Sequence, residues 1–185
     1  MNLPAFLLVA CALLARGAMA QAPTSSEQEL YAQLMEYRKK KGLPAIPLSP
    51  SLTTVAQMHA RDLADNDPVD GKCNLHSWSN KGKWVPCCYT DNHEEAECMW
   101  NKPRELTAYP GYGYEIAWSS GYAGTDTKVD AEEILEDWKS SDGHHAVIIN
   151  ADVWRKLHWN AIGIGIHKGY AVVWFGEEAD PATGN

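Results

Sequence analysis

Hydrophobic residues recur every three or four positions in two segments near the start of the chain, which is the period of an amphipathic helix. The first segment follows a capping box at Ser26 to Glu29 and ends at Gly42. The second begins with Ser49 as N-cap and Pro50 at the first helical position. Its apolar face carries Leu52, Val55, Ala56, His59 and Leu63. We therefore expect His59 to be a core or boundary histidine whose hydrogen bonds are satisfied.

The C-terminal part of the chain changes to a period of two, which predicts β-strands. Residues 159–166 alternate strictly, with isoleucines on one face and glycines on the other. The glycines leave room for close packing on their side of the sheet. Lys168 and Gly169 predict a tight hairpin that leads into a second strand at 170–175.

The middle of the chain is harder to interpret. Residues 66–112 look irregular, with room for a short helix at 91–100, and a further helix is expected after a cap at Asp126 or Thr127. The segment 144–149 is too short to assign. The order of helices, a mixed middle and an antiparallel hairpin indicates an α+β fold in which helices cover a sheet.

Composition and charge narrow the function classes. The chain has 185 residues, of which 45% are hydrophobic and 22% charged, as in a folded globular domain. Its formal net charge of −8 argues against a nucleic-acid partner, because neutralising phosphates requires a basic face. No apolar run reaches the roughly 18 to 20 residues that cross a bilayer.

Residues 1–20 differ from the rest of the chain. They contain no acidic residue, an apolar stretch and a small-x-small cleavage pattern that ends at Ala20. We interpret them as a signal peptide, which leaves residues 21–185 as one domain that is secreted or periplasmic and not transmembrane after cleavage. Two alternatives stay open: Cys11 lies in a lipobox-like sequence and could be lipidated, or the segment could persist as an uncleaved anchor.

Four cysteines lie close together after this segment: Cys73, Cys87, Cys88 and Cys98. In an exported protein an even number of cysteines indicates disulfides. Neighbouring cysteines rarely bond to each other, because their short Cα separation strains the bridge. Cys87 and Cys88 should therefore take Cys73 and Cys98 as separate partners, in either order. A four-thiolate zinc site is the competing interpretation, but the sequence lacks a C-x-x-C pair.

Three residues lie in segments that suit chemistry: His76, Glu115 and His144. They are far apart in sequence, and each histidine alone is more often structural than a ligand. The chain lacks the motifs of a serine-hydrolase elbow, an H-E-x-x-H metalloprotease, a phosphate-binding loop and an EF-hand. Acidic residues at 132–137 are most simply the solvated face of a helix.

The order of motifs along the chain resembles the CAP superfamily in its bacterial SCP-like extracellular form. That superfamily comprises the cysteine-rich secretory proteins, antigen 5 and pathogenesis-related class 1 proteins. The resemblance runs from about residue 27 to residue 176. It rests on Glu36-Tyr37-Arg38, Ala56 to Ala60, His76-Ser77, Gly113 to Ala117, Trp138 to His144, Trp159 to Gly165 and Val173 to Gly176.

The resemblance implies a three-layer α-β-α sandwich with a central antiparallel sheet. It also implies a cleft in which two histidines and two glutamates hold a divalent cation. His76 and His144 would be the histidines and Glu115 the first glutamate, whereas Ser141 stands where the second is expected. Two imidazoles and one carboxylate with an open fourth position match a catalytic-type zinc site. Adjacent His145 would point away from its neighbour, so we assign the ligand role to His144.

Our leading hypothesis is a non-enzymatic secreted protein. Its cleft would bind a divalent metal, with zinc as the candidate, and a small apolar ligand or an extracellular partner protein. The alternative is a zinc-dependent, peptidase-like hydrolase that uses His76, His144 and Glu115, with Glu115 as the candidate catalytic residue. A third hypothesis is a protein that acts through its disulfide-tied loop.

Overall fold

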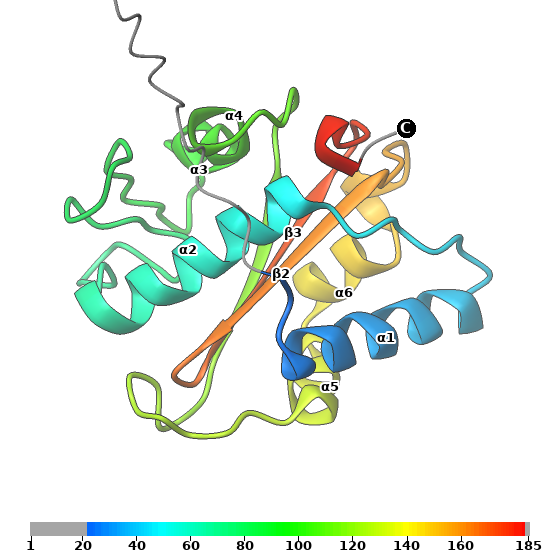
Figure 1. Cartoon of the computed structure of the whole chain (residues 1–185), viewed down its shortest axis with the longest axis horizontal. Coiled ribbons are helices and arrows are strands. Elements are labelled where there is room, and N and C mark those ends of the chain that lie inside the picture. Colours follow the sequence, from blue (N-terminus) through cyan, green and yellow to red (C-terminus); the bar gives the residue numbers. More distant parts are fainter. Residues whose placement is uncertain (1–21, 184–185) are drawn as a thin grey trace, which may run out of the picture.

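A three-stranded antiparallel sheet lies at the centre of the molecule between two layers of helices (Figure 1). The computed structural model describes residues 22–183, so the predicted signal peptide and Cys11 lie outside the described residues. The strand order is β1-β3-β2. The predicted α+β fold is confirmed. The strands are β1 (Tyr114–Ser119), β2 (Ala161–His167) and β3 (Tyr170–Gly176).

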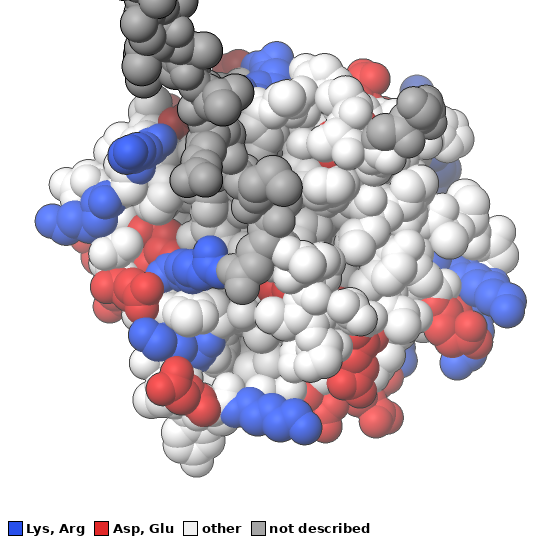
Figure 2. Space-filling model, viewed as in Figure 1, with Lys and Arg blue, Asp and Glu red and all other residues white. Residues whose placement is uncertain are grey.

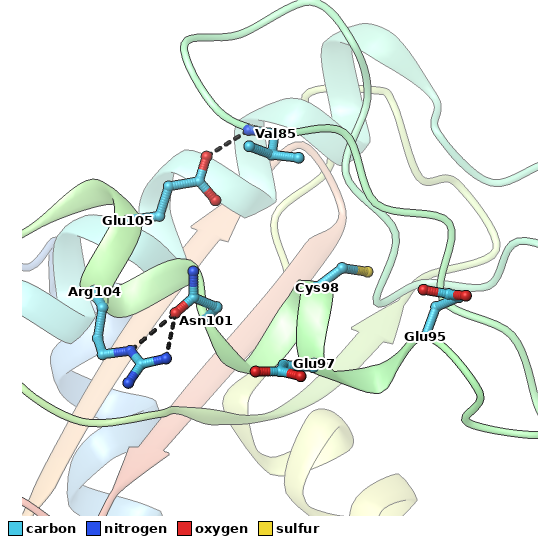
Figure 3. Close-up of a pocket in the computed structure, with 7 residues that line it drawn as sticks. All are labelled: Val85, Glu95, Glu97, Cys98, Asn101, Arg104 and Glu105. Carbon is cyan, nitrogen blue, oxygen red and sulfur yellow. Dashed lines mark hydrogen bonds between the residues drawn. The ribbon is translucent and has the colours of Figure 1, made fainter.

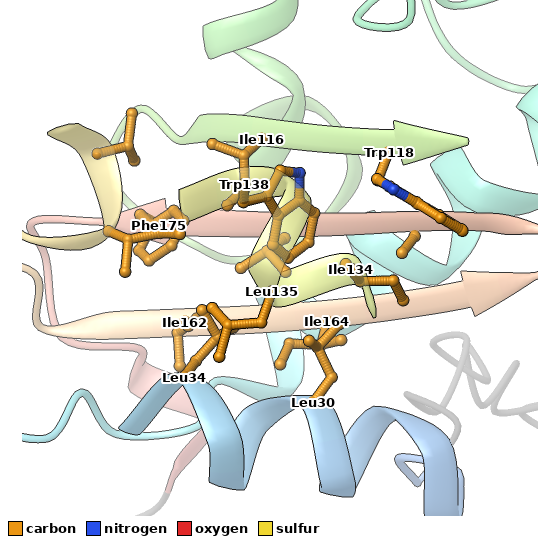
Figure 4. Close-up of a cluster of buried hydrophobic side chains, with 14 of the residues drawn as sticks. Leu30, Leu34, Ile116, Trp118, Ile134, Leu135, Trp138, Ile162, Ile164 and Phe175 are labelled. Carbon is orange, nitrogen blue, oxygen red and sulfur yellow. The ribbon is translucent and has the colours of Figure 1, made fainter. Parts of the chain in front are cut away.

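Each face of the sheet has its own hydrophobic core. Because successive strand residues point to opposite faces, Val173 and Phe175 of β3 pack in one core and Val172 and Trp174 in the other. The first core, drawn in Figure 4, is closed by α1 (Ser25–Lys40), α5 (Ala131–Ser140) and α6 (Asp142–Ile148). The second is closed by α2 (Pro50–Asn66), α3 (Ala96–Trp100) and α4 (Lys102–Leu106).

Two short 3-10 helices complete the described structure, at Asp152–Trp154 and Pro181–Thr183. None of the helices within residues 22–183 combines the length and the apolar character that crossing a bilayer requires.

The helix starts are only partly as predicted. Ser49 caps α2 and Pro50 occupies its first turn, as expected. The first helix instead begins after Thr24, whose side chain accepts from the backbone of Glu27 while the Glu27 carboxylate accepts from the backbone of Thr24. This earlier capping box starts the helix before Ser26 is reached. The cap of α5 is Asp130, four residues later than Asp126, because the intervening residues run as an extended connection.

The irregular middle segment is tied by two disulfides, Cys73–Cys88 and Cys87–Cys98. This confirms two bridges with separate partners and settles their order. The first closes a loop of 15 residues, which stabilises the fold by about 3 kcal/mol in the chain-entropy model. Strand β1 follows this segment directly. Our sequence interpretation assigned no strand there, because its run of aromatic and apolar residues does not alternate.

Helix α2 lies directly on strand β2, in the space that its glycines leave. A Cβ atom at Gly163 would lie 2.0 Å from the carbonyl carbon of Leu52, and one at Gly165 would lie 2.3 Å from that of Ala56. Both neighbours are backbone atoms of α2, so no side-chain movement could make room. The predicted close packing on the glycine face is confirmed.

Asp180, near the end of the described chain, closes the start of α2. Its carboxylate accepts from the Ser49 hydroxyl at 2.5 Å, from the Ser51 amide and hydroxyl at 2.8 and 2.9 Å, and from the Ala182 amide at 2.9 Å. A carboxylate at a helix N-terminus also interacts favourably with the helix dipole. The C-terminal segment is thereby fastened to the helix that packs on the sheet.

We expect Asp180→Ala to lower the free energy of unfolding by about 2–3 kcal/mol, because it leaves buried donors without an acceptor. Burial alone would raise the pKa of Asp180, but hydrogen bonds from Ser49, Ala182 and Ser51 outweigh it and lower the pKa. A lowered folded pKa contributes stability above the unfolded pKa of about 3.9, and this is lost as the pH falls through the folded pKa. Urea denaturation of both proteins between pH 3 and 7 measures the difference, which should shrink below about pH 4. Exposed Glu94→Ala is the control and should change little.

Candidate functional site

Glu115 is the centre of the candidate site. It lies on β1 directly opposite Trp174, so its side chain points from the sheet toward α2, and it is buried. One carboxylate oxygen, Oε2, lies 2.6 Å from Nδ1 of His59 on α2, and the other, Oε1, lies 2.7 Å from Nδ1 of His76. The structure therefore brings His76 and Glu115 together and adds His59 to them.

Hydrogen-bond chemistry fixes where the protons of this cluster lie. Nε2 of His59 is 2.9 Å from the carbonyl oxygen of Ser77, which can only accept, so this nitrogen carries a proton. Burial raises the pKa of Glu115, but the interactions with His59 and His76 outweigh it and hold the pKa below the ordinary value. The ionised carboxylate accepts from both Nδ1 atoms. In this arrangement His59 donates to Glu115 and to Ser77, whereas Nε2 of His76 faces away from Glu115.

The segment that carries His76 is held from several sides. The disulfide at Cys73 lies three residues before it, and the Ser77 hydroxyl accepts from the backbone of Tyr89 at 2.9 Å. The Tyr89 ring packs edge-on against the His76 ring, with centroids 5.1 Å apart. Asp62 of α2 accepts from the backbone and hydroxyl of Ser79 at 2.7 and 2.5 Å. The position of His76 is therefore set by covalent, backbone and side-chain contacts.

His144 approaches from the other helical layer, at the start of α6, and is partly buried. Burial lowers the pKa of His144, and the electrostatic effect of His76 lowers it further. His145 faces α1 instead, where its Nε2 lies 2.8 Å from the Tyr37 hydroxyl. Ser141, at the position of the family's second glutamate, caps α6 without a side-chain hydrogen bond.

The donor set limits the kind of metal site that fits. Within residues 22–183, no group of three or more His, Cys, Asp or Glu side chains is placed to hold a metal ion. Both oxygens of Glu115 are engaged by imidazoles, which leaves His76 and His144 as the free donors of the predicted set. Two imidazoles would leave coordination positions of the metal ion open to other ligands, whereas a closed structural site needs four protein ligands. The three-residue ligand set and the choice of zinc stay predictions.

A separate hollow of about 510 Å³ lies beside α3 and α4 (Figure 3). Within it, Arg104 donates twice to the side-chain oxygen of Asn101, at 2.9 and 2.7 Å, and Glu105 accepts from the backbone of Val85. These charged groups are engaged with their own neighbours. The hollow is lined by Val85, Glu95, Glu97, Cys98, Asn101, Arg104 and Glu105, and so by none of the three predicted site residues.

Sequence reasoning did not assign His59 to the site. The prediction that it is a buried, satisfied histidine is right, since it is 0% exposed and both its nitrogens are hydrogen-bonded. His59 lies on the same face of α2 as Leu52, Val55, Ala56 and Leu63, and this face packs against the sheet. The missing information was that the side chain of Glu115, on β1, reaches His59 on this helix.

The fold has counterparts among solved structures. An outer surface protein from Borrelia burgdorferi matches with a TM-score of 0.55 and 18% identity over 84% of this chain and 96% of that one. An extracellular protein containing an SCP domain from Bacillus anthracis gives 0.56 and 15%, and a cysteine-rich secretory protein from Staphylococcus aureus gives 0.53 and 16%. The matches cover 83% and 84% of this chain, but only 40% of each of those two proteins. At these identities the likeness shows a shared fold.

The sequence comparison points to the same class. Residues 31–86 match the model of CAP, the cysteine-rich secretory protein family. No curated protein sequence matches the chain. The family-model match and the solved structures together support a CAP-type, bacterial SCP-like domain, in agreement with the resemblance found in the sequence motifs.

Proposed function

We propose that this domain is an extracellular binding protein that takes a divalent transition-metal ion on His76 and His144 and leaves the remaining coordination positions to a ligand or partner. The observation that carries the proposal is the 2.7 Å hydrogen bond between Nδ1 of His76 and Glu115. A carboxylate behind an imidazole fixes its tautomer and makes the opposite nitrogen a better ligand. The lowered pKa of His144 favours the neutral imidazole that a metal ion requires.

The extracellular setting is supported by two observations. Two disulfides indicate an oxidising compartment. Two of the similar solved structures are named as an extracellular and an outer surface protein. The face shown in Figure 2 intersperses Lys and Arg with Asp and Glu.

The hydrogen bonds and the burial of Glu115 favour a binding role over hydrolysis. A general base must reach the proton of an attacking water. Both Glu115 oxygens already accept from histidines, and the side chain is buried. Bound zinc would supply Lewis acidity, which a binding protein uses to hold an oxygen or nitrogen donor of its ligand.

Calorimetric titration of metal-free residues 21–185 with zinc tests the proposal. We expect one ion per chain, with affinity falling at least about tenfold in His76→Ala and His144→Ala, since each removes one of two protein ligands. Exposed His158→Ala is the matched control and should bind as the wild type does. Absence of binding at millimolar zinc would refute the proposed metal role.

The second candidate function is a zinc-dependent hydrolase. It is favoured by the buried carboxylate–imidazole pair, an arrangement that also orients the general base of many hydrolases. It predicts peptide hydrolysis that a chelator stops and that His144→Ala abolishes. Hydrolysis that survives in His144→Ala would rule out this mechanism.

A further inference from the structure

His59 contacts three of the groups that surround His76. Its Nε2 binds the carbonyl of Ser77, the residue after His76, at 2.9 Å. Its Nδ1 binds the Glu115 oxygen next to the one that holds the His76 ring. Its ring stacks on Trp78, with centroids 4.3 Å apart and planes 8° apart. One side chain therefore contacts the main chain, the carboxylate and the neighbouring indole that surround His76.

This arrangement leaves His59 no freedom of its own. It is 0% exposed, and a flipped ring would place carbon atoms against the Ser77 carbonyl and the Glu115 carboxylate, so both hydrogen bonds would be lost. The Trp78 ring is fixed in turn, with Trp84 edge-on at 5.1 Å and the ammonium of buried Lys102 5.5 Å from its centroid. His59 cannot reach a ligand, so any effect on binding acts through other residues.

We propose that His59 is the positioning residue of the site: it holds Glu115 and the His76-Ser77 backbone so that His76 keeps its proton on Nδ1 and presents an unprotonated Nε2 to the ligand. Glu115 alone could accept from His76 in several orientations. With Oε2 held by His59, Oε1 is the oxygen left for His76. The inference rests on the proposed function in taking His76 as the ligand-binding imidazole.

Histidine-selective ¹⁵N NMR on residues 21–185 reads the tautomer directly. In the wild type we expect His76 protonated on Nδ1 and not on Nε2. In His59→Gln, whose shorter-reaching amide cannot satisfy both acceptors, we expect His76 to exchange between tautomers. Zinc affinity should fall about 10- to 100-fold although both proposed ligands remain, the loss typical of removing an outer-shell partner. His158→Gln is the control and should change neither the His76 tautomer nor the zinc affinity.

An unchanged His76 tautomer and unchanged zinc affinity in His59→Gln would overturn the proposal. Should that variant not fold, the wild-type spectrum decides, because His76 protonated on Nε2, or His59 lacking a proton on Nε2, also overturns it. If the wild type binds no zinc, the proposed function fails while the tautomer measurement still decides the role of His59. The two failures are therefore distinguishable.

Discussion

Replacing Glu115 with alanine is expected to lower the free energy of unfolding by about 3–5 kcal/mol, the loss found when one partner of a buried charge pair is removed. The substitution removes the carboxylate that accepts from Nδ1 of His59, and this imidazole is 0% exposed. It also releases the ring of His76. Urea denaturation of the oxidised protein, followed by circular dichroism, measures the change.

Two variants sharpen this test. Glu115→Gln keeps the volume and one acceptor oxygen, so it should cost less than Glu115→Ala. Exposed Glu94→Ala should leave stability within about 0.5 kcal/mol of the wild type, as surface substitutions usually do. A loss below about 1 kcal/mol in Glu115→Ala would mean that the buried cluster does not carry the charge pair deduced from its hydrogen bonds.

Gly165→Ala is expected to destabilise the protein by at least about 3 kcal/mol, the upper end for overpacking a core. The added methyl would lie 2.3 Å from both the carbonyl carbon and the oxygen of Ala56, so α2 itself must move away from β2. Because α2 carries His59, the same displacement should weaken zinc binding. Thermal and urea unfolding measure the first effect and titration the second.

Gly143→Ala is the matched control, because a Cβ there meets nothing within 4 Å and the residue is helical. It should stabilise the protein slightly, by up to about 1 kcal/mol, through helix propensity. Equal effects at the two glycines would contradict the packing of α2 on β2.

The sequence patterns predicted the elements whose signal is local. Alternation and the Lys168-Gly169 pair predicted the hairpin, and both residues have the positive φ of 44° and 80° that such a turn requires. The apolar face of α2 predicted which side meets the sheet. The start of α1 was misplaced because two overlapping capping boxes, at Thr24 and at Ser26, satisfy the same rule.

The site was only partly predictable. The motif order identified His76 and Glu115, which lie in direct contact. The role of His59 depends on its contact with Glu115, which lies 56 positions away in the sequence, and no local periodicity predicts such a contact. The disulfide order was undetermined for a similar reason, because both pairings of Cys87 and Cys88 fit the spacing equally well.

The adjacency of Cys87 and Cys88 has a practical consequence for preparing this protein. Successive residues of an extended chain point in opposite directions, so exchanging their partners would turn the segment over by one residue. The pairing of Trp78 with Cys87 would break, and Tyr89 would leave the ring of His76. A batch oxidised to the wrong isomer could remain compact yet inert, and peptide mapping of the crosslinks should precede every binding assay.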